Sequence, residues 1–191
     1  ATCLQLREKD LDEASFYEEA KNIKELCRLF DVPFIINDNV MLAKEIDADG
    51  VHVGQDDMAC AKAREILGPD KIIGVSAHTI EEARIAKEQG ADYLGVGAIF
   101  PTSSKDDAEV LGIKRLKEMT ETVDLPMVAI GGISYDNCLL LKDTGIDGIA
   151  VISALFGQKH IKQATIDLKK RVDALYETMH TCLTIAGSDS S

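Results

Sequence analysis

Short apolar runs alternate with amphipathic segments along most of the chain. Each run carries apolar residues at odd and even positions alike, which is typical of strands buried on both faces, as in a parallel sheet covered by helices. The runs extend over Thr2–Leu6, Phe34–Ile36, Val51–Val53, Ile72–Val75, Leu94–Val96, Met127–Ile130 and Ile149–Ile152. They predict seven buried strands.

Three of these runs belong to one repeated sequence motif. Residues 47–54, 90–97 and 145–152 read DADGVHVG, GADYLGVG and GIDGIAVI. In each, a tight polar turn comes directly before the apolar run, and the turn itself follows a helical pattern. The repeat therefore indicates that helix, turn and strand recur as one unit along the chain.

The segments between the runs have helical spacing. Apolar residues recur on one helix face from Phe16 to Phe30. A capping box, Thr79-Ile80-Glu81-Glu82, opens a helix that we expect to end near Gly90. Further helices are expected from Ser134 to near Gly145 and from about His160 to Thr178.

Strands that alternate with helices predict an α/β fold, either an open doubly wound sheet or a closed barrel. The chain has no GxGxxG after an early strand and no GxxxxGK[ST], so dinucleotide and P-loop sites have no support. We therefore predict a TIM (β/α)8-type barrel. Seven strands are one fewer than that barrel needs, as expected if its first β/α unit is missing from this chain.

Charge and composition narrow the function. The 191 residues carry a formal net charge of -12, which argues against nucleic acid or an anionic membrane surface as a partner. No apolar run is long enough to span a bilayer. The five cysteines are scattered without CxxC spacing, which is typical of reduced thiols in a cytoplasmic protein.

Polar groups follow the predicted strands, at the rim where barrels of this type place their active sites. Two carboxylates, Asp38 and Asp57, follow neighbouring strands and are hard oxygen ligands suited to Mg²⁺. Arg7 and Lys9 alternate along an extended segment, so both should point the same way. Each feature alone also fits an ordinary surface turn. Together they predict a clamp for a diphosphate.

A second anion site is expected farther along the rim. Gly131-Gly132 allows close approach of the backbone to a ligand, and Ile152-Ser153 comes just before a helix. Barrels of this type often bind phosphate after their last two strands. Two phosphate sites on one rim suggest two phosphorylated substrates.

Five ordered motifs resemble the thiamine phosphate synthase family. They are Gln5-Leu6-Arg7-Glu8-Lys9, Phe34-Ile35-Ile36-Asn37-Asp38, His52-Val53-Gly54-Gln55-Asp56-Asp57, Gly74-Val75-Ser76-Ala77-His78-Thr79 and Ile130-Gly131-Gly132-Ile133. The resemblance covers roughly residues 1 to 178. It implies a (β/α)8 barrel that joins a pyrimidine diphosphate to a thiazole phosphate and releases pyrophosphate.

The resemblance also implies roles for single residues. It assigns Mg²⁺ to Asp38 and Asp57, and departure of pyrophosphate to Arg7, Lys9, Lys105 and Ser76. The pyrimidine diphosphate would contact Gln5, Leu6, Arg7, Glu8, Lys9, Asn37, Ser76 and Lys105, and the thiazole phosphate would contact Thr102, Ser103, Ser104, Gly132, Ile152 and Ser153.

Two departures from the family pattern define the domain prediction. In the family, a strand and a helix precede the Gln5 motif. Both are missing here, so we expect the barrel to have a gap where one strand should lie. Residues 179–191 instead resemble the opening strand and loop of hydroxymethylpyrimidine phosphate kinase. We therefore expect a synthase-like barrel over residues 1–178 and a tail that starts a fused kinase domain.

Two other functions stay open. A thiazole tautomerase-like sibling barrel would share the thiazole phosphate site, but an isomerase needs no diphosphate clamp. A non-catalytic phosphate-binding fragment is the other alternative, because the first β/α unit is missing.

Overall fold

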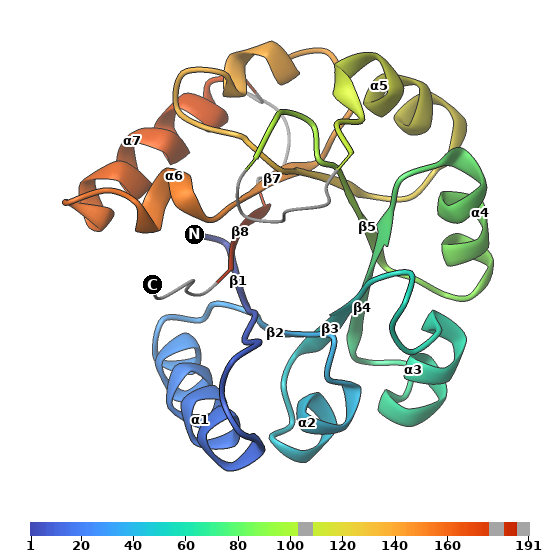
Figure 1. The fold of residues 1–191 in the computed structure, drawn as a ribbon, viewed down its shortest axis with the longest axis vertical. Helices are drawn as coiled ribbons and strands as arrows, with labels where there is room; N and C mark the ends of the chain where they lie inside the picture. Colours follow the sequence, from blue (N-terminus) through green and yellow to red (C-terminus); the bar gives the residue numbers. More distant parts are fainter. Residues whose placement is uncertain (103–108, 176–181, 187–191) are drawn as a thin grey trace.

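The computed structural model describes residues 1–102 and 109–175, together with the backbone of residues 182–186. In this part of the chain, eight parallel strands form a closed barrel with neighbours in the order β1-β2-β3-β4-β5-β6-β7-β8. The strands are β1 (Cys3–Leu6), β2 (Phe34–Asn37), β3 (Gly50–Val53), β4 (Ile72–Ala77), β5 (Tyr93–Val96), β6 (Met127–Ile130), β7 (Gly148–Val151) and β8 (Cys182–Ala186). Figure 1 looks along this ring of strands.

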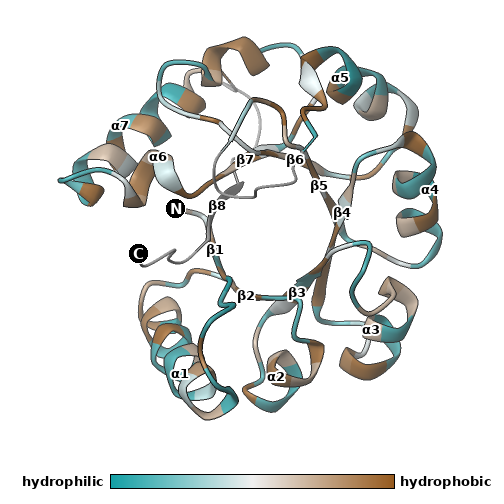
Figure 2. Cartoon of the chain, in the orientation of Figure 1, coloured by the Kyte–Doolittle hydropathy of each residue, from teal (hydrophilic) through white to brown (hydrophobic). Residues whose placement is uncertain are grey.

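Helices lie outside the ring and connect successive strands (Figure 1). They are α1 (Glu13–Leu29), α2 (Val40–Glu45), α3 (Cys60–Leu67), α4 (Ile80–Glu88), α5 (Gly112–Thr122), the 3-10 helix η1 (Cys138–Leu141), α6 (Ser153–Phe156) and α7 (Ile161–Asp173). The longer α-helices mix hydrophobic and hydrophilic residues (Figure 2), as expected for elements with one face on the core. None of the helices described is long and apolar enough to cross a membrane.

The main core lies between the strands and the helices. Along each strand, alternate side chains point outward under the helices, as Val51 and Val53 do on β3 and Leu94 does on β5. The residues between them point into the barrel, and His52 is the clearest example of a polar one. This alternation delivers polar groups to the barrel interior without breaking the apolar layer outside it.

The aspartates of the repeated sequence motif have a structural role next to the start of the strands. The carboxylates of Asp49, Asp92 and Asp147 each accept a hydrogen bond from a backbone N–H in the first two residues of the preceding strand, at 2.8, 2.7 and 2.9 Å. Each aspartate N–H also donates back to the carbonyl of that same residue. The three aspartates therefore fix the register between neighbouring strands.

The helix prediction holds where capping residues define the ends. The hydroxyl of Thr79 accepts from the Glu82 N–H at 3.1 Å, and α4 ends at Glu88 with Gln89 as its C-cap before Gly90, which has a φ of 88°. The helix expected after Ser134 is shorter than predicted: the side chain of Asn137 accepts from the Ser134 N–H, and only η1 follows. The last helix, α7, ends at Asp173.

The predicted barrel is confirmed. The expected gap at the position of one strand is wrong, because the ring is closed. Seven strands are those that the sequence predicts. The eighth, β8, comes from the tail and pairs in parallel with both β7 and β1, so it occupies the gap expected beside β1. Within the described residues, neither β1 nor β7 is left with an unpaired edge. The kinase-like character of the tail and the division at residue 178 stay predictions.

Candidate active site

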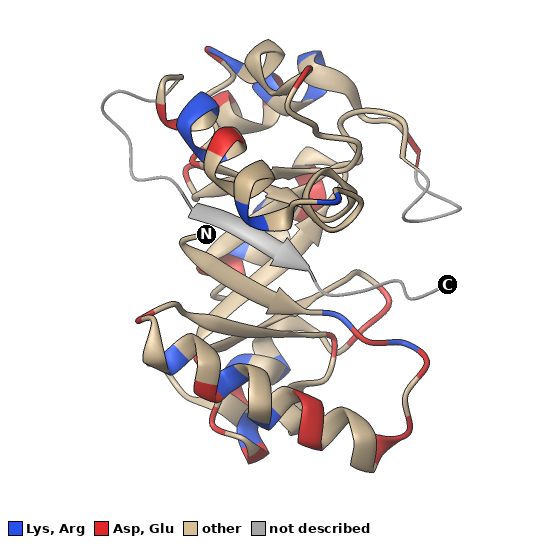
Figure 3. Cartoon of the chain, turned by 90° about the vertical axis from the view of Figure 1, so that its left-hand side faces the viewer, with Lys and Arg blue, Asp and Glu red and all other residues tan. Residues whose placement is uncertain are grey.

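The carboxyl ends of β1, β2 and β3 bring three polar segments to one end of the barrel. Residues 7–10 follow β1, Asp38 follows β2, and residues 54–57 follow β3. In Figure 3 the segment after β1 shows cationic and acidic residues in alternation. The predicted grouping of these charges at one rim is therefore present in the fold.

Asp38 is the centre of this charged group. Its backbone has a φ of 62°, and its N–H donates to the carbonyl of His52 at 2.8 Å, which ties it to the neighbouring strand. The ammonium of Lys9 donates to its carboxylate. Burial raises the pKa of Asp38, the nearby carboxyl of Asp57 raises it further, and Lys9 opposes both effects. Asp38 and Asp57 are thus close enough to repel one another.

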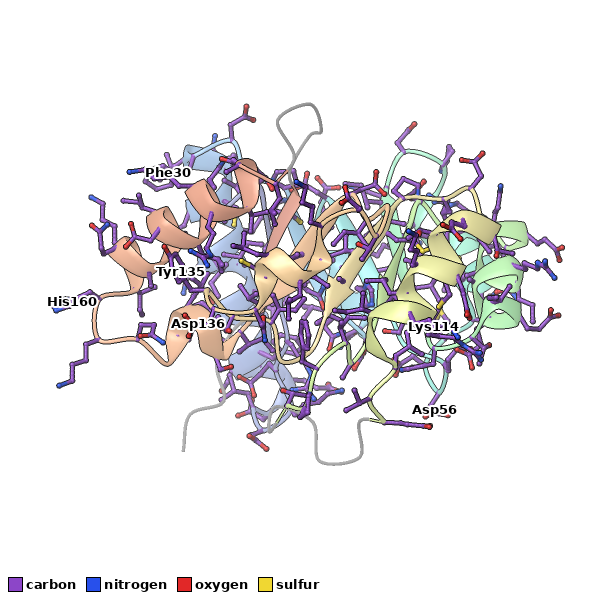
Figure 4. All side chains as sticks on the ribbon, turned by 90° about the horizontal axis from the view of Figure 1, so that it is seen from above. Phe30, Asp56, Lys114, Tyr135, Asp136 and His160 are labelled. Atoms are coloured by element: carbon purple, nitrogen blue, oxygen red, sulfur yellow. The ribbon has the colours of Figure 1, made fainter. Side chains whose placement is uncertain are left out.

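Asp57 also shapes the turn in which it lies. Its Oδ2 atom accepts from the Gly54 N–H at 2.7 Å, and a side chain at position 54 would come within 2.9 Å of that oxygen. The Gln55 amide donates to the Ser76 carbonyl at 2.6 Å, which joins the ends of β3 and β4. Asp56, labelled in Figure 4, lies at the outer edge of the molecule and is exposed.

The barrel interior beneath this rim contains a short polar chain. The ring nitrogens of His52 lie 2.9 Å from the Tyr93 hydroxyl (Nδ1) and 3.0 Å from the Ser76 hydroxyl (Nε2). Burial lowers the pKa of His52 from 6.5 to about 4, so the ring is neutral at pH 7. The sequence predicts His52 as a packed strand residue, which is correct. It does not single out Tyr93, because the contact depends on the register of three strands.

The other predicted contacts from the first two strands differ in what their side chains can offer. Gln5 is buried on β1, and the Asn37 amide donates weakly to the His52 carbonyl at 3.4 Å. Leu6 is 2% exposed and packs in the core, so only its backbone is free to meet a ligand. The Glu8 carboxylate accepts from the N–H groups of Lys9 and Asp10, both at 2.8 Å, and so holds the turn after β1.

The predicted second anion site is built around two glycines after β6. Gly131 and Gly132 have φ values of 92° and 64°, a region that favours glycine. A side chain on Gly132 would come within 2.7 Å of the Phe100 carbonyl oxygen, so the turn packs directly on the segment after β5. Asn137 donates to the Gly132 carbonyl at 2.8 Å and fixes the turn.

Two further predicted positions follow β7, and others fall outside the description. Ile152 precedes α6 and Ser153 begins it. Thr102 lies on the segment after β5, whereas Ser103, Ser104 and Lys105 lie outside the described residues. The fold thus places Thr102, Gly132 and Ser153 after three neighbouring strands, β5, β6 and β7.

The described residues contain no group of three or more His, Cys, Asp or Glu side chains placed to hold a metal ion. Two carboxylates at one rim are instead the arrangement that Mg²⁺ uses when water and substrate phosphate complete its shell. The rim therefore combines acids and an ammonium after β1, β2 and β3, a half-buried hydroxyl on β4, and a glycine turn after β6.

Comparison with known proteins decides the family. The family model for thiamine monophosphate synthase matches residues 1–155. The chain belongs to this family. It is therefore an enzyme of thiamine biosynthesis, and the motifs predicted from the sequence fall within the matched residues.

Individual members of the family agree. Thiamine-phosphate synthase of Clostridium tetani is 52% identical over 167 residues, which are 87% of this chain and 80% of that protein. The protein of the same name from Methanobrevibacter smithii is 50% identical, over 90% of this chain and 82% of its own. The solved thiamine phosphate pyrophosphorylase of Pyrococcus furiosus superposes with a TM-score of 0.86 at 44% identity, covering 92% of this chain and 84% of that one.

More distant structures share the barrel alone. A 3-hexulose-6-phosphate synthase structure has a TM-score of 0.63 at 15% identity, covering 89% of this chain and 99% of that chain. Among barrels of this kind the synthase family is thus distinguished by its rim residues, not by its fold.

Proposed function

We propose that the chain joins 4-amino-2-methyl-5-(diphosphooxymethyl)pyrimidine to a thiazole phosphate, giving thiamine phosphate and pyrophosphate. One observation carries the proposal: the half-buried carboxylate of Asp38 and the exposed carboxylate of Asp57 lie together at one rim, and the Lys9 ammonium pairs with Asp38. Acids and cations at one point suit a metal-bound diphosphate better than any uncharged ligand.

Mg²⁺ fits the two aspartates. Burial and mutual repulsion destabilise the charge on Asp38, and Lys9 offsets this only in part. A divalent cation would relieve the same strain, because it favours both ionised carboxylates at once. When bound, Mg²⁺ would neutralise charge on the diphosphate and make pyrophosphate a better leaving group.

The side chains of the rim would assist departure of the pyrophosphate. Arg7 presents a planar fork to phosphate oxygens, while Lys9 and Lys105 supply mobile charges. The carbon–oxygen bond of the pyrimidine breaks with its electron pair passing to pyrophosphate, and the thiazole nitrogen then forms the new carbon–nitrogen bond. No protein nucleophile is required.

The substrates would divide the rim between them. The pyrimidine diphosphate would lie over β1, β2 and β4, against Gln5, Leu6, Glu8, Asn37 and Ser76. The thiazole phosphate would lie over β5, β6 and β7, against Thr102, Ser103, Ser104, Gly132, Ile152 and Ser153. The two reacting atoms would then meet across the barrel opening.

The test is to incubate the chain with both substrates and Mg²⁺ and to measure thiamine phosphate by mass spectrometry. We expect Asp57→Asn, which keeps an acceptor for the Gly54 N–H but loses the charge, to reduce kcat/KM about 100-fold or more. Asp56→Asn is the matched control and should stay within about twofold of the unaltered chain.

Three outcomes separate the candidate functions. Formation of thiamine phosphate that depends on Asp57 supports the proposal. Conversion of the thiazole alone would indicate a tautomerase-like barrel, and no turnover of either substrate would indicate a phosphate-binding fragment. Equal rates for Asp57→Asn and Asp56→Asn would remove the metal role from Asp57.

We further propose a cytoplasmic setting and a covalent link to a pyrimidine kinase domain. Cys27, Cys60 and Cys138 are buried free thiols, which suits a reducing compartment. The link rests on the resemblance of residues 179–191 to the start of that kinase. Sequencing the coding region on both sides of this segment tests it, and a stop codon directly after Ser191 would contradict it.

A further inference from the structure

The polar chain inside the barrel connects three strands. Tyr93 comes from β5, His52 from β3 and Ser76 from β4, and the imidazole of His52 lies between the two hydroxyls at 2.9 and 3.0 Å. His52 is 8% exposed, whereas Ser76 is only half-buried and lies nearer the rim. The chain therefore runs from inside the barrel to a hydroxyl that a ligand can reach.

Two glycines make room for this arrangement. A side chain on Gly74 would come within 2.5 Å of His52 Nδ1 and would also collide with the Tyr93 ring. A side chain on Gly95 would come within 2.8 Å of His52 Cε1. Gly74 pairs with His52 of β3 on one side and with Tyr93 of β5 on the other. Because glycine has no side chain, β4 leaves space at this position for both rings. The interior is thus shaped around the contact.

The donor and the acceptor in each of these hydrogen bonds follow from the chemistry of the three groups. A neutral imidazole has one N–H donor and one acceptor nitrogen, so it donates on one side and accepts on the other. A phenol is a more acidic hydroxyl than an alcohol and is the stronger donor. The favoured order is therefore Tyr93 O–H to Nδ1, and Nε2–H to the Ser76 oxygen.

We propose that His52 and Tyr93 are positioning residues that hold the Ser76 hydroxyl as a hydrogen-bond donor toward the bound pyrimidine diphosphate. This inference rests on the proposed function. With Nε2–H occupying one lone pair of the Ser76 oxygen, the serine proton is directed away from His52 and toward the barrel opening. The hydroxyl then meets an acceptor atom of the pyrimidine, and its orientation is fixed before the substrate arrives.

Kinetics in two backgrounds test the coupling. Tyr93→Phe removes only the hydroxyl, and it should lower kcat about tenfold with little change in KM for the thiazole phosphate. In a Ser76→Ala background the same change should have less than about a twofold effect, because the group it positions is absent. Tyr135→Phe, on the exposed segment before η1 (Figure 4), is the matched control and should have no effect in either background.

Two substitutions of His52 give a second kinetic comparison. The terminal nitrogen of glutamine takes the place of Nε2, and that of asparagine takes the place of Nδ1. His52→Gln can therefore still donate to Ser76, whereas His52→Asn can reach only toward Tyr93. We expect His52→Gln to retain several-fold more turnover than His52→Asn. A purely structural role would instead make the two variants alike at equal thermal stability.

A spectroscopic measurement decides the geometry without any turnover. Long-range ¹H–¹⁵N spectra should show His52 as one fixed neutral tautomer with the proton on Nε2, assigned by its loss in His52→Gln. Tyr93→Phe should shift mainly the Nδ1 resonance and Ser76→Ala mainly the Nε2 resonance. A mixed or Nδ1-protonated tautomer would overturn the proposal, as would equal kinetic losses from Tyr93→Phe in both backgrounds.

The two tests also keep this proposal apart from the proposed function. Absence of thiamine phosphate from the unaltered chain would contradict the proposed function, while the spectra would still decide the hydrogen-bond order. Full synthase activity together with additive kinetics would retain the function and reject the positioning role.

Discussion

His52 shows what burial does to a single ionisable residue. Its ring is enclosed inside the barrel, where the charged form loses its hydration, and the pKa falls from 6.5 to about 4. The Asp57 carboxylate acts in the opposite direction but does not outweigh burial. The residue is therefore held neutral at physiological pH.

This shift predicts a pH dependence of stability. Because the folded-state pKa lies below the unfolded value of 6.5, the unfolded chain binds the proton more readily once the pH falls below 6.5. Stability should fall as the pH drops from about 6.5 toward 4. From His52 alone, the free energy of unfolding should be about 2 kcal/mol lower at pH 5 than at pH 7.

Urea unfolding at the two pH values checks this prediction. His52→Gln is the control, since it removes the titrating group and should show a correspondingly smaller difference between pH 7 and pH 5. If the variant loses as much stability as the unaltered chain, the pH dependence comes from other residues.

The repeated turn and strand show how an element is fixed from its first residue. The carboxylates of Asp49, Asp92 and Asp147 each accept a hydrogen bond from a backbone N–H near the start of the preceding strand. The acids in these turns therefore have a structural role, separate from that of the acids at the opposite rim.

The most direct test of this role is Asp147→Ala. We expect it to lower the free energy of unfolding by about 1–3 kcal/mol, because the Met127 N–H loses a charge-assisted partner. Asp136→Ala, on an exposed turn (Figure 4), is the matched control and should change stability by less than about 0.5 kcal/mol. Equal losses in the two variants would show that the aspartate repeat is not what fixes the strands.

The elements also show what could be predicted from sequence. Runs such as Phe34–Ile36 and Met127–Ile130 are apolar at every position and alternate with helical segments, so the strands and the α/β fold follow directly. The strand in the tail is expected as the opening of a second domain, and its place between β7 and β1 could not be predicted because the short apolar run does not specify its pairing partners. The contact of Lys9 with Asp38 and the chain through His52 could not be predicted, because both depend on register between strands that sequence periodicity does not determine.

Removal of β8 should therefore weaken the barrel. Ending the chain after residue 181 would leave one edge of β1 and one edge of β7 without backbone partners. We expect a lower thermal midpoint and faster amide exchange in both strands than in the full chain. Ending the chain after residue 186 is the control, since it keeps β8. Equal midpoints for the two shortened chains would contradict a role for β8 in closing the barrel.

At the scale of the whole molecule, the net negative charge opposes the binding of an anionic substrate. The formal net charge of -12 repels a diphosphate, and at the rim the Lys9 ammonium is already paired with Asp38. A bound metal ion would change the sign of the local field. Anion binding should therefore depend on the metal far more than on the protein's own cations.

Pyrophosphate, the expected product, gives a test that needs no turnover. At about 100 times its Kd with Mg²⁺ it should stabilise the chain by about 3 kcal/mol and raise Tm by about 5–10 °C. With EDTA in place of Mg²⁺, or in Asp57→Asn with Mg²⁺, the rise should be largely lost. An equal rise without the metal would show that the cations alone hold the diphosphate.

Closure of the ring joins the two most distant parts of the chain, because Cys3 of β1 lies opposite Thr184 of β8 (Figure 1). Pairing of such remote segments has a high loop-closure entropy and is slow. Strand β1 carries Lys9 toward the acids that follow β2 and β3, and it gains its second neighbour only when β8 docks. We expect Lys9 and the acids after β2 and β3 to become rigid in the last step of folding. Binding of a diphosphate would therefore require a closed barrel.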